Sequence, residues 1–207
     1  MRKVIKATTL AGLILVALAA PAPARAQDGG YAASPESYYP RLQFGASFLP
    51  MSAGKFTSTP GGMTTTAEAA FAYGVSVSGN YTLLPGLSVG LAPQVVLNVK
   101  AKDDPAAAAK EIDVMARVAY TFPVVDTISL YAEVLPGYSL IIPQDGDTAA
   151  GLVVAFGVGG IMDLSRQAFV SLGAGYQVGF QKLPAMDMSA EVRTKYVRVA
   201  LDGGVRF

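Results

Sequence analysis

The stretch from Ala69 to Val99 contains no charged residue, yet its apolar residues recur at every second position. The alternation pauses at Pro85-Gly86 and then resumes. A period of two is that of a β-strand, in which successive side chains point to opposite faces. Proline followed by glycine favours a turn and would break a helix. The stretch therefore predicts two strands joined by a short turn, not a membrane-spanning helix.

The same alternation runs through the rest of the chain and predicts eight strands. They are expected at residues 42–50, 67–83, 87–100, 111–122, 128–142, 151–164, 168–181 and 192–207. Short turns are expected at Leu84–Gly86, Pro123–Thr127 and Ser165–Gln167, and longer loops at Met51–Thr66, Ala101–Lys110, Pro143–Ala150 and Lys182–Glu191. Short and long connections thus alternate, which is typical of outer-membrane barrels. The expected fold is all-β, an eight-stranded antiparallel up-and-down transmembrane β-barrel.

Most charges within the expected strands fall on one face of each strand, as Asp113 and Arg117 do in the strand at 111–122. A membrane barrel turns its apolar face to lipid and its polar face inward, whereas a soluble barrel does the reverse. The polar face here is rich in Gly, Ala and Ser, which suits a crowded interior better than a Lys- and Glu-rich exterior. Composition agrees, since 52% of residues are hydrophobic and 15% are charged. The pattern favours a membrane barrel over a soluble periplasmic one.

Aromatic residues on the apolar face form two groups along the strands. Tyr is enriched at both interfaces of a membrane, so two groups predict two girdles. One group lies beside the short turns or at the C-terminus and the other toward the long loops. These residues are Tyr81, Tyr120, Phe122 and Phe207 in the first group, and Phe71, Tyr73, Tyr138, Tyr176 and Phe180 in the second.

The first 26 residues have the pattern of a secretory signal peptide. Basic residues precede an apolar run from Ala7 to Ala20, which is too short for a membrane span. Ala24 and Ala26 are the small residues that predict cleavage before Gln27. We therefore expect a signal peptide at 1–26, a periplasmic tail at 27–40 and the barrel at 41–207. Cleavage would leave 12 basic and 15 acidic residues, a net charge of −3, with no basic stripe for nucleic acid.

The inward charges predict a network inside the lumen. If Phe122 pairs with Ile128, Arg117 faces Glu133 directly as an opposite-charge cross-strand pair. An isolated charge in a narrow lumen costs several kcal/mol, so pairing is favoured. For the remaining inward charges, the alternative to pairing is solvation by water in the lumen. The other expected members of the network are Glu68, Asp113, Arg198, Asp202 and Arg206.

A signal peptide, eight alternating strands and a terminal Phe207 resemble the small outer-membrane β-barrels of the OmpA/OmpX type. The last strand resembles that family's C-terminal assembly signal, carried here by Val199, Leu201, Val205 and Phe207. Val205 stands where the family often has an aromatic residue. The resemblance implies partners in the outer-membrane insertion machinery and periplasmic chaperones, and outer-membrane lipid around the barrel. No peptidoglycan-binding domain is expected, so cell-wall tethering is not implied.

Chemical sites are nearly absent from the sequence. The chain has no Cys and no His, which removes thiol chemistry and the Ser-His-Asp triad. Outer-membrane enzymes of similar architecture rely on a catalytic His, so the resemblance also argues against an enzyme. The glycines between Gly173 and Gly179 lack the spacing of a dinucleotide loop and fit a strand interior. Asp145 and Asp147 are too few for a calcium site. No cofactor or metal is expected.

Two classes of function follow, and both fit a monomer. The first is a structural or surface-interaction barrel that holds four outer loops around a largely side-chain-filled polar lumen, as the narrowness of eight strands favours. The second is a small porin-like pore or conduit for ions or small hydrophobic solutes. A soluble periplasmic lipocalin-like binder remains as a further alternative.

Overall fold

The computed structural model describes residues 41–59, 63–102, 108–144, 146–183 and 190–207. The expected cleavage site at Ala24, Ala26 and Gln27 and the periplasmic tail lie outside these residues. Among the described residues there is no helix long and apolar enough to cross a membrane.

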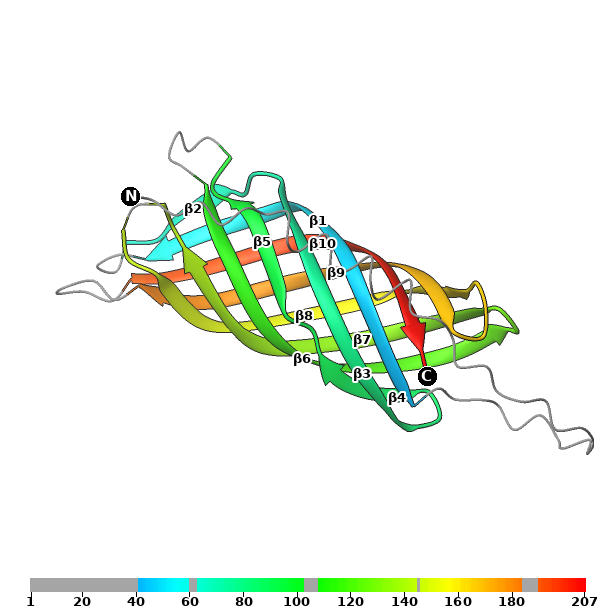
Figure 1. Ribbon diagram of the computed structural model, residues 1–207. Coiled ribbons are helices and arrows are strands. Elements are labelled where there is room, and N and C mark those ends of the chain that lie inside the picture. The colour runs from blue at the N-terminus through cyan, green and yellow to red at the C-terminus, as the bar shows by residue number, and fades with distance from the viewer. Residues whose placement is uncertain (1–40, 60–62, 103–107, 145, 184–189) are drawn as a thin grey trace, which may run out of the picture. The chain divides into compact units, whose positions relative to one another are not determined.

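The described chain forms antiparallel strands that close into a ring of eight (Figure 1). Strand β10 pairs with β1 and so closes the ring, β1 also pairs with β3, and from β6 to β10 each strand pairs with the next in sequence. The segments β4 and β5 together fill the position between β3 and β6. The strands are β1 Leu42–Thr59, β2 Thr65–Glu68, β3 Ala72–Leu84, β4 Leu87–Leu91, β5 Gln94–Val99, β6 Ala109–Val125, β7 Ile128–Ile142, β8 Ala149–Asp163, β9 Ala168–Leu183 and β10 Ala190–Arg206. The predicted eight-stranded antiparallel barrel is confirmed.

The first outer connection is shorter than expected, because β1 continues from the ring into a hairpin with β2. Residues Lys55–Ser58 pair with Thr65–Glu68, where a loop at Met51–Thr66 was expected. The hairpin is rich in threonine, a β-branched residue that favours strands. The hydroxyls of Thr57 and Thr66 lie 3.3 Å apart across it.

The strand expected at 87–100 is interrupted. Pro93 lacks an N–H for the strand ladder and separates β4 from β5. Asn98 has a positive φ of 63°, and the register with β6 shifts between Val96 and Val99. The shift turns Val99 into the lumen, where it is buried. The alternation that begins at Leu87 and Val89 predicts Val99 on the outer face, and that prediction is wrong.

The register between β6 and β7 also differs from the expected one. Phe122 pairs with Leu130, two residues beyond Ile128, because β6 extends to Val125 before a tight turn. A shift of two residues keeps each side chain on its predicted face, since the period of a strand is two.

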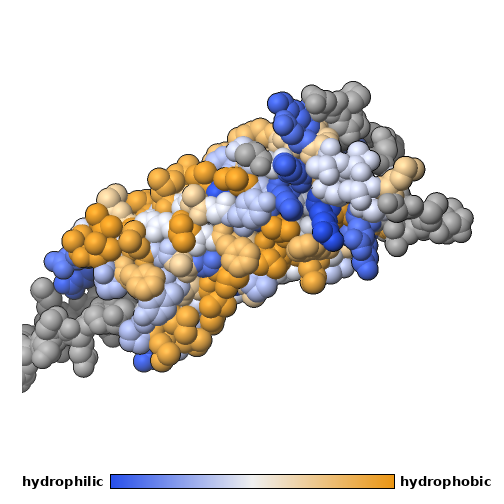
Figure 2. Space-filling view, turned by 180° about the vertical axis from the view of Figure 1, so that it is seen from behind, coloured by the Kyte–Doolittle hydropathy of each residue, from blue (hydrophilic) through white to orange (hydrophobic). Residues whose placement is uncertain are grey.

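The faces themselves follow the predicted alternation. Large apolar side chains are exposed on the outside of the wall, among them Val114, Leu152 and Leu172. Figure 2 shows hydrophobic side chains over much of one side of the barrel. The inside is buried and mixed, with apolar side chains such as Met51 and Met115 beside Gln, Glu, Asp, Ser and Arg. The barrel is therefore apolar outside and polar inside.

Candidate functional site in the barrel lumen

The polar side chains of the lumen lie in two layers. The acidic layer, nearer the long loops, consists of Gln94, Glu111, Asp113, Ser139 and Gln177. The arginine layer, nearer the short turns, consists of Arg117, Glu133, Ser171, Arg198 and Asp202. The strand alternation places all ten inward, and their positions along the strands separate the two layers.

In the acidic layer, amide side chains from opposite sides of the barrel meet across the lumen. Nε2 of Gln94, on β5, lies 2.5 Å from Oδ2 of Asp113 and 3.0 Å from Oε1 of Gln177, on β9. Nε2 of Gln177 in turn donates to Oδ2 of Asp113 at 3.1 Å. These contacts join β5, β6 and β9 through the middle of the barrel.

Glu111 extends this network toward β7. Its Oε1 accepts a hydrogen bond from the Ser139 hydroxyl at 3.1 Å and one from Nε2 of Gln177 at 3.4 Å. The Ser139 hydroxyl also accepts from Nε2 of Gln181 at 3.2 Å. Each of these side chains is at most 2% exposed. The acidic layer is therefore a dry cross-connection through the lumen.

Apolar side chains fill the same end of the lumen. Tyr196, Leu49 and Met51 form one buried cluster with Val96 and Ile141. Met115 and Val153 belong to a second cluster. Together with the acidic layer, these residues leave the loop end of the lumen closely packed.

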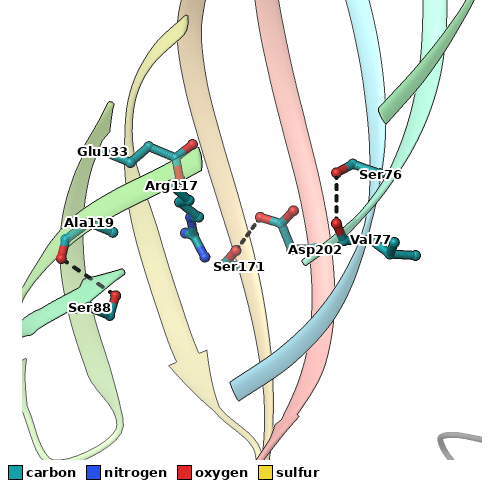
Figure 3. A network of polar contacts seen from close by, with 8 residues as sticks. All are labelled: Ser76, Val77, Ser88, Arg117, Ala119, Glu133, Ser171 and Asp202. Carbon is teal, nitrogen blue, oxygen red and sulfur yellow. Dashed lines mark hydrogen bonds and ion pairs between the residues drawn. The ribbon is translucent and has the colours of Figure 1, made fainter. Parts of the chain in front are cut away.

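The arginine layer contains the expected ion pair. Nε of Arg117 lies 2.7 Å from Oε2 of Glu133 (Figure 3). Glu133 is directly opposite Ala119, so Arg117 reaches it diagonally rather than from the facing position. The guanidinium of Arg117 also lies 5.9 Å from the centre of the Tyr131 ring. The contact is as predicted, although the register that led to it is wrong.

A small cavity lies between the side chains of the arginine layer. It measures about 40 Å³ and is lined by Arg117, Glu133, Arg198, Ser171 and Asp202, among others. The Ser171 hydroxyl donates to Oδ2 of Asp202 at 2.5 Å (Figure 3). Arg198 is buried, and its Nη1 has no partner among the described residues. Four of the expected charges thus gather here, whereas Asp113 belongs to the acidic layer.

Two other residues that were expected in the lumen network lie elsewhere. Glu68 is exposed on the β1–β2 hairpin and lies 3.4 Å from Nζ of Lys102, so its assignment to the lumen is wrong. The reason is that β2 projects outside the ring, where alternation no longer distinguishes inside from outside. Arg206 lies at the turn end, with Nη1 2.5 Å from Oδ1 of Asp163, and its guanidinium lies over the Phe169 ring. Asp163, at the end of β8, was not predicted as its partner.

The expected assembly signal lies along the outer face of β10 and at the C-terminus. Leu201 and Phe207 are exposed, and the Phe207 ring meets that of Phe44 edge to face at 6.4 Å. Val199 and Val205 are half-buried. The role of these residues in assembly stays a prediction.

The residues of the two expected aromatic girdles all lie on the outer surface, each at least 41% exposed. Tyr120 and Phe122 pack against one another with ring centres 4.6 Å apart. Outward aromatic side chains fit interfacial positions, and their depth in a membrane stays a prediction.

The glycine-rich stretch of β9 makes room for one side chain. A Cβ atom at Gly173 or Gly159 would collide with Tyr131, which faces Gly159 on β8 and reaches over it to Gly173 on β9. The stretch is a strand interior and not a nucleotide-binding loop. Within the described residues, no group of three or more His, Cys, Asp or Glu side chains could hold a metal ion. Asp145 lies outside the described residues.

No protein-family model and no curated protein matches the chain. Among solved structures, the outer membrane protein OprG from Pseudomonas aeruginosa is similar over 81% of this chain and 96% of its own, at 12% identity and a TM-score of 0.59. Neisserial surface protein A is 13% identical with a TM-score of 0.48, over 80% of this chain and 97% of its own. The OprG comparison shows that the chain has the fold of a small outer-membrane β-barrel.

Proposed function

We propose that this chain is an integral outer-membrane barrel without enzymatic activity, whose lumen is closed and whose outer loops serve structural support or surface contact. The observation that carries the proposal is the acidic layer, which joins opposite walls of the barrel through buried hydrogen bonds. The proposed function needs no cofactor and no nucleic acid.

The outer wall supports a membrane location. Side chains such as Phe48, Leu152, Phe156 and Leu172 are each about half exposed on the outside of the wall. Contiguous apolar surface of this extent is unfavourable in water and favourable in lipid. A soluble lipocalin-like binder would need the reverse arrangement, with an apolar interior for its ligand. The buried amides and carboxylates of this lumen argue against such a binder.

The lumen supports a closed barrel rather than an open channel. A water molecule needs about 10–15 Å³ of accessible volume, so the cavity of about 40 Å³ holds only a few waters. Between that cavity and the long loops stand the acidic layer and the buried side chains of Met51, Met115 and Tyr196. Passage of an ion would require hydrogen bonds of the acidic layer to separate.

The cavity itself is the feature that favours the second candidate, a small pore. Arg117 and Glu133 line it and would form the polar part of a water path. A pore therefore predicts reproducible single-channel conductance that is lost when Arg117 or Glu133 is substituted. A closed barrel predicts no such conductance.

Cell fractionation combined with a heat-dependent mobility shift in detergent gels tests the location. We expect the protein in the outer-membrane fraction, with a folded band that migrates differently after boiling. Release with the periplasmic fraction and identical mobility before and after boiling would instead identify a soluble binder. Insertion by the outer-membrane machinery, delivery by periplasmic chaperones and a monomeric state belong to the same proposal.

A further inference from the structure

Cationic side chains cluster on one arc of the outer wall, at the end that carries the long loops. Lys55 on β1, Lys195 and Arg193 on β10, and Lys182 on β9 are all exposed. The same end of β7 and β8 presents Ile142, Tyr138 and Leu152 on its outer face. Four exposed cations thus lie together on β1, β9 and β10, and Lys110 on β6 is a further exposed cation at the same end, paired with Ile142.

A β-bulge places two of these cations side by side. Below it, Ser52 pairs with Val197 and lies on the outer face, so strict alternation would turn Lys55 into the lumen. The register shifts between Ser52 and Lys55, and Lys55 then pairs directly with Lys195, with both side chains exposed. Bulges commonly re-aim a side chain in this way.

Neither lysine forms an ion pair among the described residues, although Glu68 lies opposite Lys55 on β2. Like charges in directly opposed strand positions are destabilising. Within the described residues, neither Lys55 nor Lys195 has a carboxylate within 4.0 Å, since the nearby Glu68 pairs with Lys102 and Glu191 with Arg193. An external anion would stabilise this pair.

Directly below the cations the wall is apolar. On β10 the outward positions from Val197 to Val205 carry no charge, and a tilted strand spans a bilayer with about 9–11 residues. Tyr176 and Val197 are paired and exposed, and the guanidinium of Arg193 lies 5.7 Å from the centre of the Phe180 ring. An anion bound to these cations would therefore be continuous with an apolar surface.

We propose that this arc binds an acylated, phosphorylated glycolipid of the outer leaflet, with its phosphates on Lys55 and Lys195 and its acyl chains along β9 and β10. The inference rests on the proposed outer-membrane location. A phosphorylated lipid fits because it combines the two features that the arc presents, an anionic headgroup and apolar chains, at the boundary where they meet. A soluble polyanion would use the lysines and leave the apolar wall uncovered.

Lipid retention by the folded protein tests the proposal. The probe is lipid A, a bisphosphorylated acylated disaccharide, added to protein in detergent micelles and followed by native mass spectrometry. Removing one interfacial lysine is expected to weaken binding about fivefold, so Lys55→Gln/Lys195→Gln should weaken it about 25-fold. Higher salt should also weaken binding by the wild-type protein. Lys100→Gln/Lys110→Gln removes the same charge from the same end, and we expect it to retain lipid A like the wild type.

Equal retention of lipid A and of the same lipid without its phosphates would overturn the proposal. So would unchanged binding by the Lys55→Gln/Lys195→Gln variant. The heat-dependent gel shift is measured on the same samples, because it separates the two proposals. A protein without that shift contradicts the membrane barrel itself, whereas a shifted protein that fails the lipid test contradicts only the glycolipid site.

Discussion

The two polar layers of the lumen stabilise buried carboxylates in different ways. In the arginine layer, Glu133 lies against the guanidinium of Arg117 and borders a cavity. In the acidic layer, Glu111 and Asp113 receive hydrogen bonds from uncharged amides and a hydroxyl, and the described residues place no cation within 4.0 Å of them. A charge pair beside a cavity can exchange partners with water. A dry network cannot do so without losing its hydrogen bonds, and we therefore assign closure of the lumen to the acidic layer.

The largest effect is expected from Gln177→Glu, which adds a third carboxylate to the acidic layer with little change in shape. Gln177 donates to both Glu111 and Asp113, and the substitution replaces these donors with a like charge. We expect the free energy of unfolding to fall by about 4 kcal/mol, measured by urea unfolding in lipid vesicles. Gln144→Glu adds the same charge at an exposed position and is expected to have little effect. Similar stabilities for the two variants would show that the acidic layer is not dry.

Loss of the ion pair in the arginine layer is expected to lower the free energy of unfolding less than Gln177→Glu does. Glu133→Gln leaves Arg117 with a weaker acceptor, but water in the adjacent cavity can solvate the guanidinium. The expected loss of stability is about 2 kcal/mol in the same unfolding experiment. Arg117→Met/Glu133→Gln removes both partners and should recover part of that loss. A larger loss for Glu133→Gln than for Gln177→Glu would reverse the comparison between the layers.

Gly173→Ala probes the packing that holds the arginine layer in place. The added methyl would collide with the Tyr131 hydroxyl, and we expect a loss of about 1.5 kcal/mol. Combining it with Tyr131→Phe removes the colliding oxygen and should restore part of the stability. If the double variant is no more stable than Gly173→Ala alone, contact with the Tyr131 hydroxyl is not the cause.

The smallest effect is expected outside the lumen. Glu68 and Lys102 form an exposed pair on the outer hairpin, and such pairs contribute at most about 1 kcal/mol. Glu68→Gln should therefore change the unfolding free energy by no more than about 0.5 kcal/mol, although it makes the same chemical change as Glu133→Gln. A loss as large as that of Glu133→Gln would place Glu68 in a buried network after all.

The barrel and its two faces could be predicted from the sequence because alternation depends only on neighbouring residues. The Arg117–Glu133 contact was also predictable, since a register error of two residues preserves the face and leaves the pair within diagonal reach. Alternation failed where the backbone departs from a regular strand. Val99 turns inward after the positive φ of Asn98, and Glu68 lies on a hairpin outside the ring.

The acidic layer as a unit was not predictable. Gln94 and Gln177 lie on the inward faces of distant strands, and their contact depends on the curvature that brings β5 opposite β9. Sequence spacing contains no information about which amides meet across a lumen. The sequence shows only two uncharged amides and two carboxylates on the polar faces of the expected strands.

Single-channel recording of the folded protein in planar bilayers tests most directly whether the acidic layer closes the lumen. The wild-type protein is expected to give no reproducible conductance. Gln94→Ala/Gln177→Ala removes the amide bridge across the lumen and should allow conductance, provided that its heat-dependent gel shift shows a folded barrel. Reproducible conductance through the wild-type protein, unchanged in the Gln94→Ala/Gln177→Ala variant, would contradict closure by the acidic layer.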